Sequence, residues 1–404
     1  MSADSPHLLP ERPNLRHLKD EAKALLKAGK AASLSEAQLK IGRMYGFSSW
    51  SKLKAHVDEK NLGHDVTDLK QAIDGNDLDR VKLLMTRNPA LHRAPMGYGN
   101  NGPLTWVAEC RVPWEPPTPV RLAMAQWMID NGSDVHQGSD GPLMRAALRD
   151  DRIPMMELLF RNGADVNAEW AGFFPIIFAP CESLASGSLR WLIDHGANPD
   201  CASAGRKYPD TALDYVIGTY SRSERLGACI DILLAARCPT RRNIPAVLEI
   251  LRGRIDRLRE VLDADPGLVS RRFGELDFGT TGNRSLTLRG GSLLHVAAEY
   301  GNAEAAQLLL DRGADVNARA QIDEASVGGQ TPIFHAVSQS FDFGLPMVEF
   351  LVKHGADLSI SARIPGNYEH PEEVVETTPL GYAQRFPGGE NKTTAFLRTA
   401  GASG

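Results

Sequence analysis

The sequence has few cysteines, and these form no recognisable pattern. Five occur in 404 residues, and no two of them are separated by only two residues. Disulfide frameworks and cysteine-rich zinc sites depend on paired spacings of that kind. The sequence therefore predicts free thiols in a reducing compartment and no structural metal site. The cysteines are Cys110, Cys181, Cys201, Cys229 and Cys238.

Long hydrophobic runs are also missing. No stretch approaches the roughly 20 apolar residues that a membrane helix needs. The start of the chain, MSADSPHLLPERPNL, lacks the basic and apolar regions of a secretory signal. We expect a cytoplasmic, soluble protein that has no membrane partner.

The sequence motifs of common catalytic sites are absent as well. We find no GxSxG, no GxxxxGK[ST] and no dinucleotide fingerprint. We therefore predict no catalytic residues and no cofactor, and we favour a protein that is not an enzyme while leaving that question open. A net charge of −5 gives no general attraction for nucleic acid, so a nucleic-acid partner is not expected.

What the sequence does contain is one phrase, repeated. In each copy an apolar run is followed, at a matched offset, by a glycine, then an alanine, then an aspartate or asparagine. Self-similarity at a fixed period indicates a repeat architecture. Four copies read LLFRNGADVN (158–167), LIDHGANPD (192–200), LLLDRGADVN (308–317) and LVKHGADLS (351–359).

Residues 290–320 illustrate how one unit is expected to fold. Leu293, Leu294, Ala297 and Ala298 recur at helical spacing and predict a short helix, which Gly301 ends. Asn302 can cap a second helix that contains three leucines, and Gly313 stops it. The ADVN that follows is typical of a turn, because Asp and Asn side chains bond nearby backbone. Such a helix pair cannot bury its apolar side alone and needs neighbouring units.

These features resemble the ankyrin repeat, whose pattern TPLHxAA…LL…GADVN is matched best by Ser292–Asn317. Poorer copies, two of which lack the opening, bring the total to about nine units. The resemblance implies an all-α solenoid with extended finger loops across residues 66–402. It also implies non-covalent recognition of a protein partner, because ankyrin-like arrays mostly present surfaces.

Three loops that precede a first helix are longer than the repeat requires. We call them finger 1 (residues 271–291), finger 2 (320–329) and finger 3 (361–378). Long extensions on one side of a repeat array are more often functional than neutral. We therefore expect them to take part in recognition.

A stripe of aromatic and charged residues is expected along the concave face, on the first helices. Aligning the units on the Leu or Ile of TPL places these residues two, five and six positions further on, and positions three apart share one side of a helix. Aromatic residues with interleaved charge are typical of a recognition surface, although they could instead fill the joints between units. The predicted binding residues are Trp106, Glu109, Arg145, Arg149, Tyr215, Glu299, Tyr300, His335, Tyr382 and Arg385.

Finger 3 supports an alternative prediction, a small-molecule binder or enzyme. Its residues Tyr368, His370 and Glu373 could cover a pocket between residues 361–378 and the groove near His335. His295 is different, because it occupies the histidine position of TPLH. The resemblance implies that it bonds the backbone of the turn.

The first sixty residues form a separate segment. Residues 1–13 are expected to be disordered, and residues 14–62 to form a helical domain that caps the array. The motif YGFSSWSKLKAHV resembles the start of some bacterial ankyrin-like proteins. Residues 1–62 carry 11 Lys/Arg and 7 Asp/Glu, a net charge of +4, so a DNA-linked adaptor acting through residues 14–60 is a second alternative.

Overall fold

The structure is a computed structural model. It describes residues 7–10, 13–61, 64–97, 101–109, 115–170, 172–201, 211–217, 225–240, 244–274, 286–339, 342–365, 373–385 and 389–402. The chain divides into two compact units. Unit 1 comprises Met1–Ala147 and Asp151–Ile176, and unit 2 comprises Leu148–Asp150 and Ile177–Gly404.

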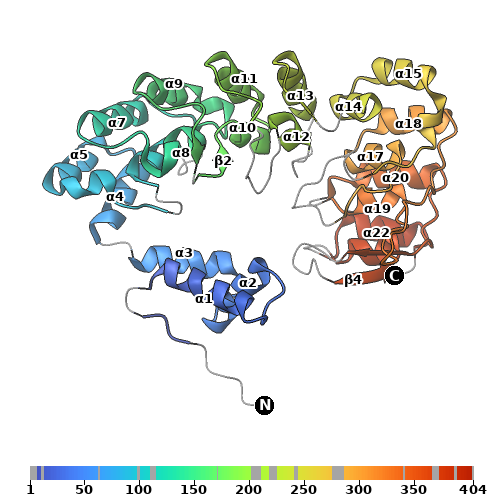
Figure 1. Ribbon diagram of the computed structural model, residues 1–404, viewed down its shortest axis with the longest axis horizontal. Coiled ribbons are helices and arrows are strands. Elements are labelled where there is room, and N and C mark those ends of the chain that lie inside the picture. The colour runs from blue at the N-terminus through green and yellow to red at the C-terminus, as the bar shows by residue number, and fades with distance from the viewer. Residues whose placement is uncertain are drawn as a thin grey trace. The chain divides into compact units, whose positions relative to one another are not determined.

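The described residues are mostly helical (Figure 1). In unit 1 the α-helices are α1 (Leu15–Lys27), α2 (Leu34–Met44), α3 (Trp50–Asn61), α4 (His64–Asp74), α5 (Leu78–Arg87), α6 (Pro103–Glu109), α7 (Pro119–Asp130), α8 (Gln137–Ala146) and α9 (Ile153–Arg161). In unit 2 they are α10 (Phe178–Ser183), α11 (Ser186–Asp194), α12 (Ala212–Ile217), α13 (Arg225–Ala235), α14 (Pro245–Arg252), α15 (Ile255–Ala264), α17 (Leu293–Glu299), α18 (Ala303–Asp311), α19 (Pro332–Val337), α20 (Leu345–Lys353), α21 (Pro379–Ala383) and α22 (Lys392–Thr399). Short 3-10 helices span Pro89–Arg93, Asp150–Arg152 and Pro266–Val269.

Local sequence explains where these helices begin and end. Asn302 caps α18 by accepting the Ala305 amide at 2.9 Å, and Gly301 and Gly313 have φ of +66° and +87°. The predicted turn chemistry of the repeated phrase is also present. An aspartate carboxylate accepts the backbone N–H two residues later at Asp134, Asp165, Asp315 and Asp357, over 2.8–2.9 Å. The repeated phrase is therefore a structural stop signal.

In each unit the helices form two layers. In unit 1, α4, α6 and α8 pack in succession, and α5, α7 and α9 form the second layer. In unit 2, α14, α17, α19 and α21 follow one another in the same way, and α15 packs on α18 and α20 on α22. The first helices α17 and α19 are short, with seven and six residues, and neither has an exposed residue. This is the packing of neighbouring helix pairs that the repeats predicted.

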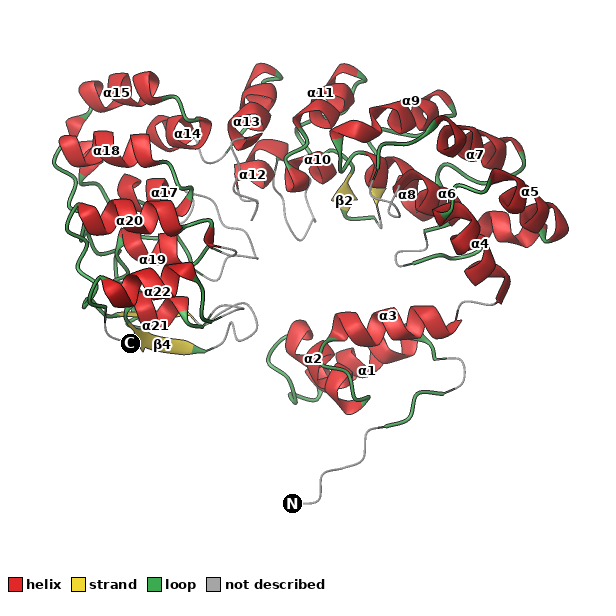
Figure 2. Cartoon of the chain, turned by 180° about the vertical axis from the view of Figure 1, so that it is seen from behind, coloured by secondary structure: helices red, strands yellow, loops and turns green. Residues whose placement is uncertain are grey.

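Two β-hairpins interrupt the helical pattern (Figure 2). Strand β1 (Glu169–Trp170) pairs with β2 (Phe174–Pro175), and β3 (Ala362–Pro365) pairs with β4 (Val374–Thr377), both antiparallel. The prediction of an all-α chain is therefore wrong for finger 3. Its Ala362, Ile364 and Val375 are buried while Arg363 and Glu376 are exposed, which is the alternation of a half-buried strand.

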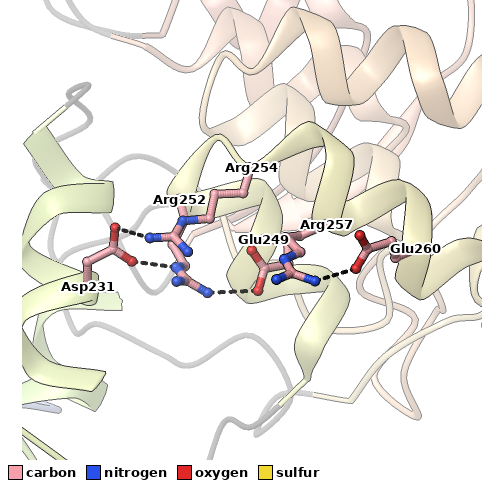
Figure 3. A network of polar contacts seen from close by, with 6 residues as sticks. All are labelled: Asp231, Glu249, Arg252, Arg254, Arg257 and Glu260. Carbon is pink, nitrogen blue, oxygen red and sulfur yellow. Dashed lines mark hydrogen bonds and ion pairs between the residues drawn. The ribbon is translucent and has the colours of Figure 1, made fainter. Parts of the chain in front are cut away.

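Ion pairs connect α13, α14 and the start of α15 (Figure 3). The Arg252 guanidinium lies between two helices, at 2.6 Å from Asp231 and 2.7 Å from Glu249. Arg254 bonds the other oxygen of Asp231, also at 2.6 Å. Arg252 is only 13% exposed, whereas Arg254 is 46% exposed. The Arg252 bonds are therefore the better shielded from solvent, and together the pairs couple successive helix pairs.

The N-terminal helices have a small core of their own. Leu18 and Ala22 of α1, Ile41 of α2, and Leu53 and Val57 of α3 are all buried in one cluster. The described residues here are mostly helical, whereas a separate domain over residues 14–62 and its role as a cap stay predictions. Throughout the part of the chain that the structure describes, no helix combines the length and apolar character of a membrane span.

Candidate functional site

Hydrogen bonds connect the three fingers to one another in unit 2. The Gln321 amide donates to the Gly290 carbonyl at 3.0 Å, which joins finger 2 to finger 1. The Gly328 amide donates to the Arg363 carbonyl at 2.7 Å, which joins finger 2 to β3 in finger 3. Three separate loops therefore form one continuous surface, with finger 2 in the middle.

Gly328 is required for this arrangement. Its φ of +130° lies in a region that other residues rarely adopt, and a Cβ there would lie 2.2 Å from the Gln321 carbonyl oxygen. The backbone of finger 2 doubles back closely at this point. A larger residue would push finger 2 away from β3.

A pocket of about 150 Å³ lies among the fingers. All three loops contribute to its lining, which mixes polar and apolar groups in about equal measure. Its most buried apolar residues are Ile364 and Leu286, which are 0% and 3% exposed. Ile322, at 60% exposed, stands at the mouth. The complete lining is Leu286, Thr287, Arg289, Gln321, Ile322, Asp323, Val327, Gly328, Gln330, Ile364 and Pro365.

The charged side chains that line the pocket differ in the hydrogen bonds and ion pairs that they form. The Asp323 carboxylate accepts the amides of Ala325 and Val327, each at 2.9 Å, and so holds the turn of finger 2. Arg289 is exposed, and its guanidinium forms no ion pair within the described ranges. The pocket lining therefore includes one cationic side chain, Arg289, and one anionic side chain, Asp323.

Gln330 forms the polar part of the floor and is 2% exposed. Its Nε2 donates to the Thr287 carbonyl at 3.1 Å, which defines Oε1 as the acceptor atom of the amide. Oε1 is buried, and no described group donates to it. A buried acceptor without a donor is costly and is uncommon in native proteins.

His295 lies behind Gln330 in the protein core. The Ser292 amide donates to His295 Nδ1 at 3.0 Å, so the proton of the neutral ring is on Nε2, which donates to the Gln330 carbonyl at 3.1 Å. Burial lowers the pKa of His295 to about 4, so the ring is neutral at pH 7. The predicted backbone-bonding role of His295 is confirmed.

The predicted stripe residues lie mainly at contacts between successive helices. Trp106 on α6 donates its indole N–H to Asp74 on α4 at 2.9 Å, and the Lys70 ammonium lies 4.3 Å from the centroid of its ring. Arg145 on α8 lies 3.8 Å from Glu109 on α6, and both are less than 15% exposed. These contacts couple neighbouring units, which is the alternative that the sequence left open.

In unit 2 the predicted stripe residues also lie at contacts between successive helices. Tyr215 stacks on Phe178 with ring centroids 4.2 Å apart, and the Tyr300 hydroxyl donates to the Ile217 carbonyl at 2.8 Å. His335 Nδ1 lies 2.7 Å from Glu299 Oε2, and the two side chains are 0% and 3% exposed.

For three of the predicted binding residues, the prediction that they contact a partner is wrong. Tyr382, His335 and Glu299 are buried, so they present no surface to a partner in this structure. The physical reason is that each first helix packs between two others and leaves little of its stripe uncovered.

The remaining predicted residues are exposed or lie outside the described ranges. Arg149 is exposed, and Arg385 lies 3.5 Å from Glu373, with both roughly half exposed. Tyr368 and His370 lie outside the described residues. The pocket that we observe is lined by neither His335 nor Glu373, and no cluster of three or more metal-ligating side chains occurs in the described ranges.

The fold and the finger loops define a helical-repeat protein with a shaped loop surface. The family model "Ankyrin repeats (3 copies)" matches residues 262–362, a segment that contains α17, α18 and most of the finger surface. This segment is therefore similar to ankyrin repeats, as the sequence pattern predicted.

Similar proteins include one curated relative and one solved structure. The mouse B-cell lymphoma 3 protein homolog is 41% identical over 87 residues, which is 21% of this chain, and the chain spans 18% of the length of that protein. The crystal structure of the human ASB11 ankyrin repeat domain covers 75% of this chain and 100% of its own, at 18% identity and a TM-score of 0.32.

Proposed function

We propose that this protein recognises a protein partner non-covalently, with the surface of fingers 1 to 3 as its main contact. The observation that carries the proposal is the pocket shared by the three loops, with a buried apolar floor and an exposed Ile322 at its mouth. Binding hot spots typically consist of an anchor side chain in such a pocket, surrounded by a polar rim.

The volume of the pocket favours a single side chain of a partner protein, and not a metabolite, as its ligand. Ligand sites for small molecules typically have volumes of about 300–1,000 Å³, whereas this pocket has about 150 Å³. One side chain fills that space. The alternative of a small-molecule binder would need a larger cavity at finger 3, and His335 is buried against Glu299.

The repeat array supports the finger surface from behind. We propose that about nine ankyrin-type units extend over residues 66–402 and that residues 14–62 cap them. Among the predicted binding residues, we keep Arg149 and Arg385 of the stripe and Glu373 of finger 3 as contributors because they are exposed. The paired residues Trp106, Arg145 and Tyr215 act mainly in coupling the units.

A pull-down with three forms of the full chain tests the proposal. The first is the unchanged chain, the second carries Ile322→Asp at the pocket mouth, and the third carries Leu83→Asp on α5. The two positions are matched controls, because Ile322 is 60% exposed and Leu83 is 65% exposed. We expect proteins that the unchanged chain and Leu83→Asp both retain and that Ile322→Asp loses. Equal retention by all three forms would contradict the proposal.

A further inference from the structure

We propose that an extended segment of the partner protein adds a strand to the outer edge of β4. This inference rests on the proposed function and specifies the form in which the partner binds the fingers. It combines the order of the backbone pairings across the fingers with two residues of β4, Val374 and Glu376. The outward backbone groups of these two bond nothing in the part of the chain that the structure describes.

The finger surface is built by backbone pairing from one loop to the next. Finger 1 bonds finger 2 through Gly290 and Gln321, and finger 2 bonds β3 through Gly328 and Arg363. Strand β3 then pairs along its length with β4. Strand β4 is therefore the last member of this series, and Figure 2 shows it at the outer end of unit 2, next to α21.

The orientation of the β3 backbone determines which groups of β4 face outward. The Gly328 amide donates to the Arg363 carbonyl at 2.7 Å, so this carbonyl points toward finger 2 and away from β4. In an antiparallel pair, opposite residues alternate between exchanging hydrogen bonds and exchanging none. Arg363 and Glu376 therefore form a pair without mutual hydrogen bonds, and Pro365 and Val374 form the next such pair. The proline has no N–H to donate, which agrees with this assignment.

Val374 and Glu376 consequently turn their N–H and C=O groups outward. Neither residue has a backbone hydrogen bond to any group outside the hairpin, as far as the structure describes the chain. Both side chains are exposed, Val374 at 42%. Two donors and two acceptors along an exposed strand edge are a template for a further strand.

Charge contributes little to the choice of segment at this edge. Glu373, beside the start of β4, lies 3.5 Å from Arg385, and Glu376 lies across the hairpin from Arg363. Both carboxylates therefore have a cation nearby. Pairing of backbone groups is the remaining attraction, and it requires a segment without proline at the paired positions.

The exposed face of the hairpin adds a preference for a β-branched residue. Val374 and Pro365 lie opposite each other on this face. A β-branched residue of the partner, placed beside Val374, extends this apolar pair by one strand. The favoured ligand is therefore an extended segment in which such residues alternate with polar ones.

An NMR titration of the full chain tests the inference with a defined peptide. The probe is acetyl-KTVTVTE-amide, which has no net charge and is rich in β-branched residues. Its control is the same peptide N-methylated at the five central residues, which removes their N–H donors on both edges. The variants are Val374→Pro, which removes one outward donor of β4, and Val374→Thr, which keeps that donor and the β-branched shape.

We expect the peptide to shift the amide signals of Val374 and Glu376 and to slow their hydrogen exchange. The amides of Val375 and Thr377, which face β3, should change little. Val374→Thr should bind as the unchanged chain does, and Val374→Pro should bind at least about fivefold more weakly, as the loss of one hydrogen bond predicts. Raising the salt concentration should change the affinity less than about twofold, because the pairing depends little on charge. The N-methylated peptide should not bind, and this comparison decides alone if Val374→Pro does not fold.

No binding of the probe, equal binding of the two peptides, or equal affinities of Val374→Pro and Val374→Thr would overturn the inference. A free chain that sediments as a dimer, with the Val374 and Glu376 amides already protected, would also overturn it, because a second copy would then occupy the edge. The proposed function fails separately. A pull-down that depends on Ile322, together with no binding of the peptide, would retain the finger surface as a protein contact and reject only the added strand.

Discussion

His295 Nε2 lies 3.1 Å from the carbonyl oxygen of Gln330, so a buried histidine of a first helix holds the residue that forms the pocket floor. The same ring accepts the Ser292 amide through Nδ1 and thereby fixes the start of α17. One side chain therefore connects the helical repeat to the finger surface. The repeat supplies the rigidity that a preformed pocket needs.

Replacing His295 by alanine should therefore destabilise the protein markedly. The change removes two buried hydrogen bonds and leaves a cavity, since the side chain is fully buried. We expect the free energy of unfolding to fall by roughly 3 kcal/mol. Urea unfolding at pH 7, followed by circular dichroism, measures this loss. A loss below about 1 kcal/mol would show that the ring is dispensable.

The same residue should also make stability depend on pH. Burial lowers the folded-state pKa of His295 to about 4, from the ordinary value of 6.5, so the unfolded chain takes up its proton first as pH falls. Stability from this group is fully present above pH 6.5 and is lost between about pH 6.5 and 4. The difference between the folded and unfolded pKa values corresponds to roughly 3 kcal/mol of unfolding free energy. His295→Ala should lack this component, and an identical pH profile in both forms would refute the assignment.

The sequence predicted the helical repeats and their turns because these depend on local patterns. Asn302, Gly301 and Gly313 act within a few residues of their own position. The finger pocket depends on packing between loops up to about 80 residues apart, and no spacing reveals it. The alternation around Ile364 and Val375 was the available signal for strands in finger 3.

The stripe was harder to interpret for a related reason. Residue type alone does not distinguish an exposed groove from a joint between helices. Trp106 and His335 have the character of recognition residues, and the structure places each against an acid of the preceding first helix, Asp74 and Glu299. Only the interatomic distances in the structure show that these residues join neighbouring helix pairs.

Gly328→Ala should separate finger 2 from β3. The new methyl group would meet the Gln321 carbonyl oxygen at 2.2 Å, in a backbone conformation that alanine rarely adopts. Gly329→Ala is the matched control, because Gly329 also has positive φ but its nearest neighbour lies at 3.5 Å. We expect Gly328→Ala to lose about 1–3 kcal/mol more stability. Thermal unfolding of both variants compares them, and equal losses would contradict the close approach.

Asp342 should stabilise the last helix of the chain. Its carboxylate accepts the amide and the hydroxyl of Thr393, both at 2.9 Å, at the start of α22. These bonds lower the pKa of Asp342, chiefly through the Thr393 amide, so the stabilisation is present above pH 3.8 and fades as pH falls below it.

Asp342→Ala should cost about 1 kcal/mol at pH 7, as the loss of a helix cap does. Asp342→Asn should cost less, because the amide oxygen still accepts and asparagine tolerates the positive φ of 58°. Chemical denaturation of the two variants provides the comparison. The reverse order would rule out the capping role.

The described cysteines should be unreactive in the folded chain. Burial raises the pKa of Cys201 and of Cys229 to about 12, and it also raises the pKa of Cys181 and Cys238. Since the thiolate is the reactive form, iodoacetamide at pH 8 should label these four only after unfolding. Peptide mapping by mass spectrometry identifies the labelled sites. Rapid labelling of Cys181 or Cys229 in the native protein would contradict their burial.

Site-specific photo-crosslinking tests the central claim most directly. A benzophenone amino acid is placed at Ile322 in one sample and at Leu83 in another, two positions of similar exposure. The account predicts crosslinked protein adducts from Ile322, strongly reduced when Gly328→Ala disturbs the fingers, and few from Leu83. Equal adducts from both positions, or adducts from Leu83 alone, would show that the fingers are not the recognition surface.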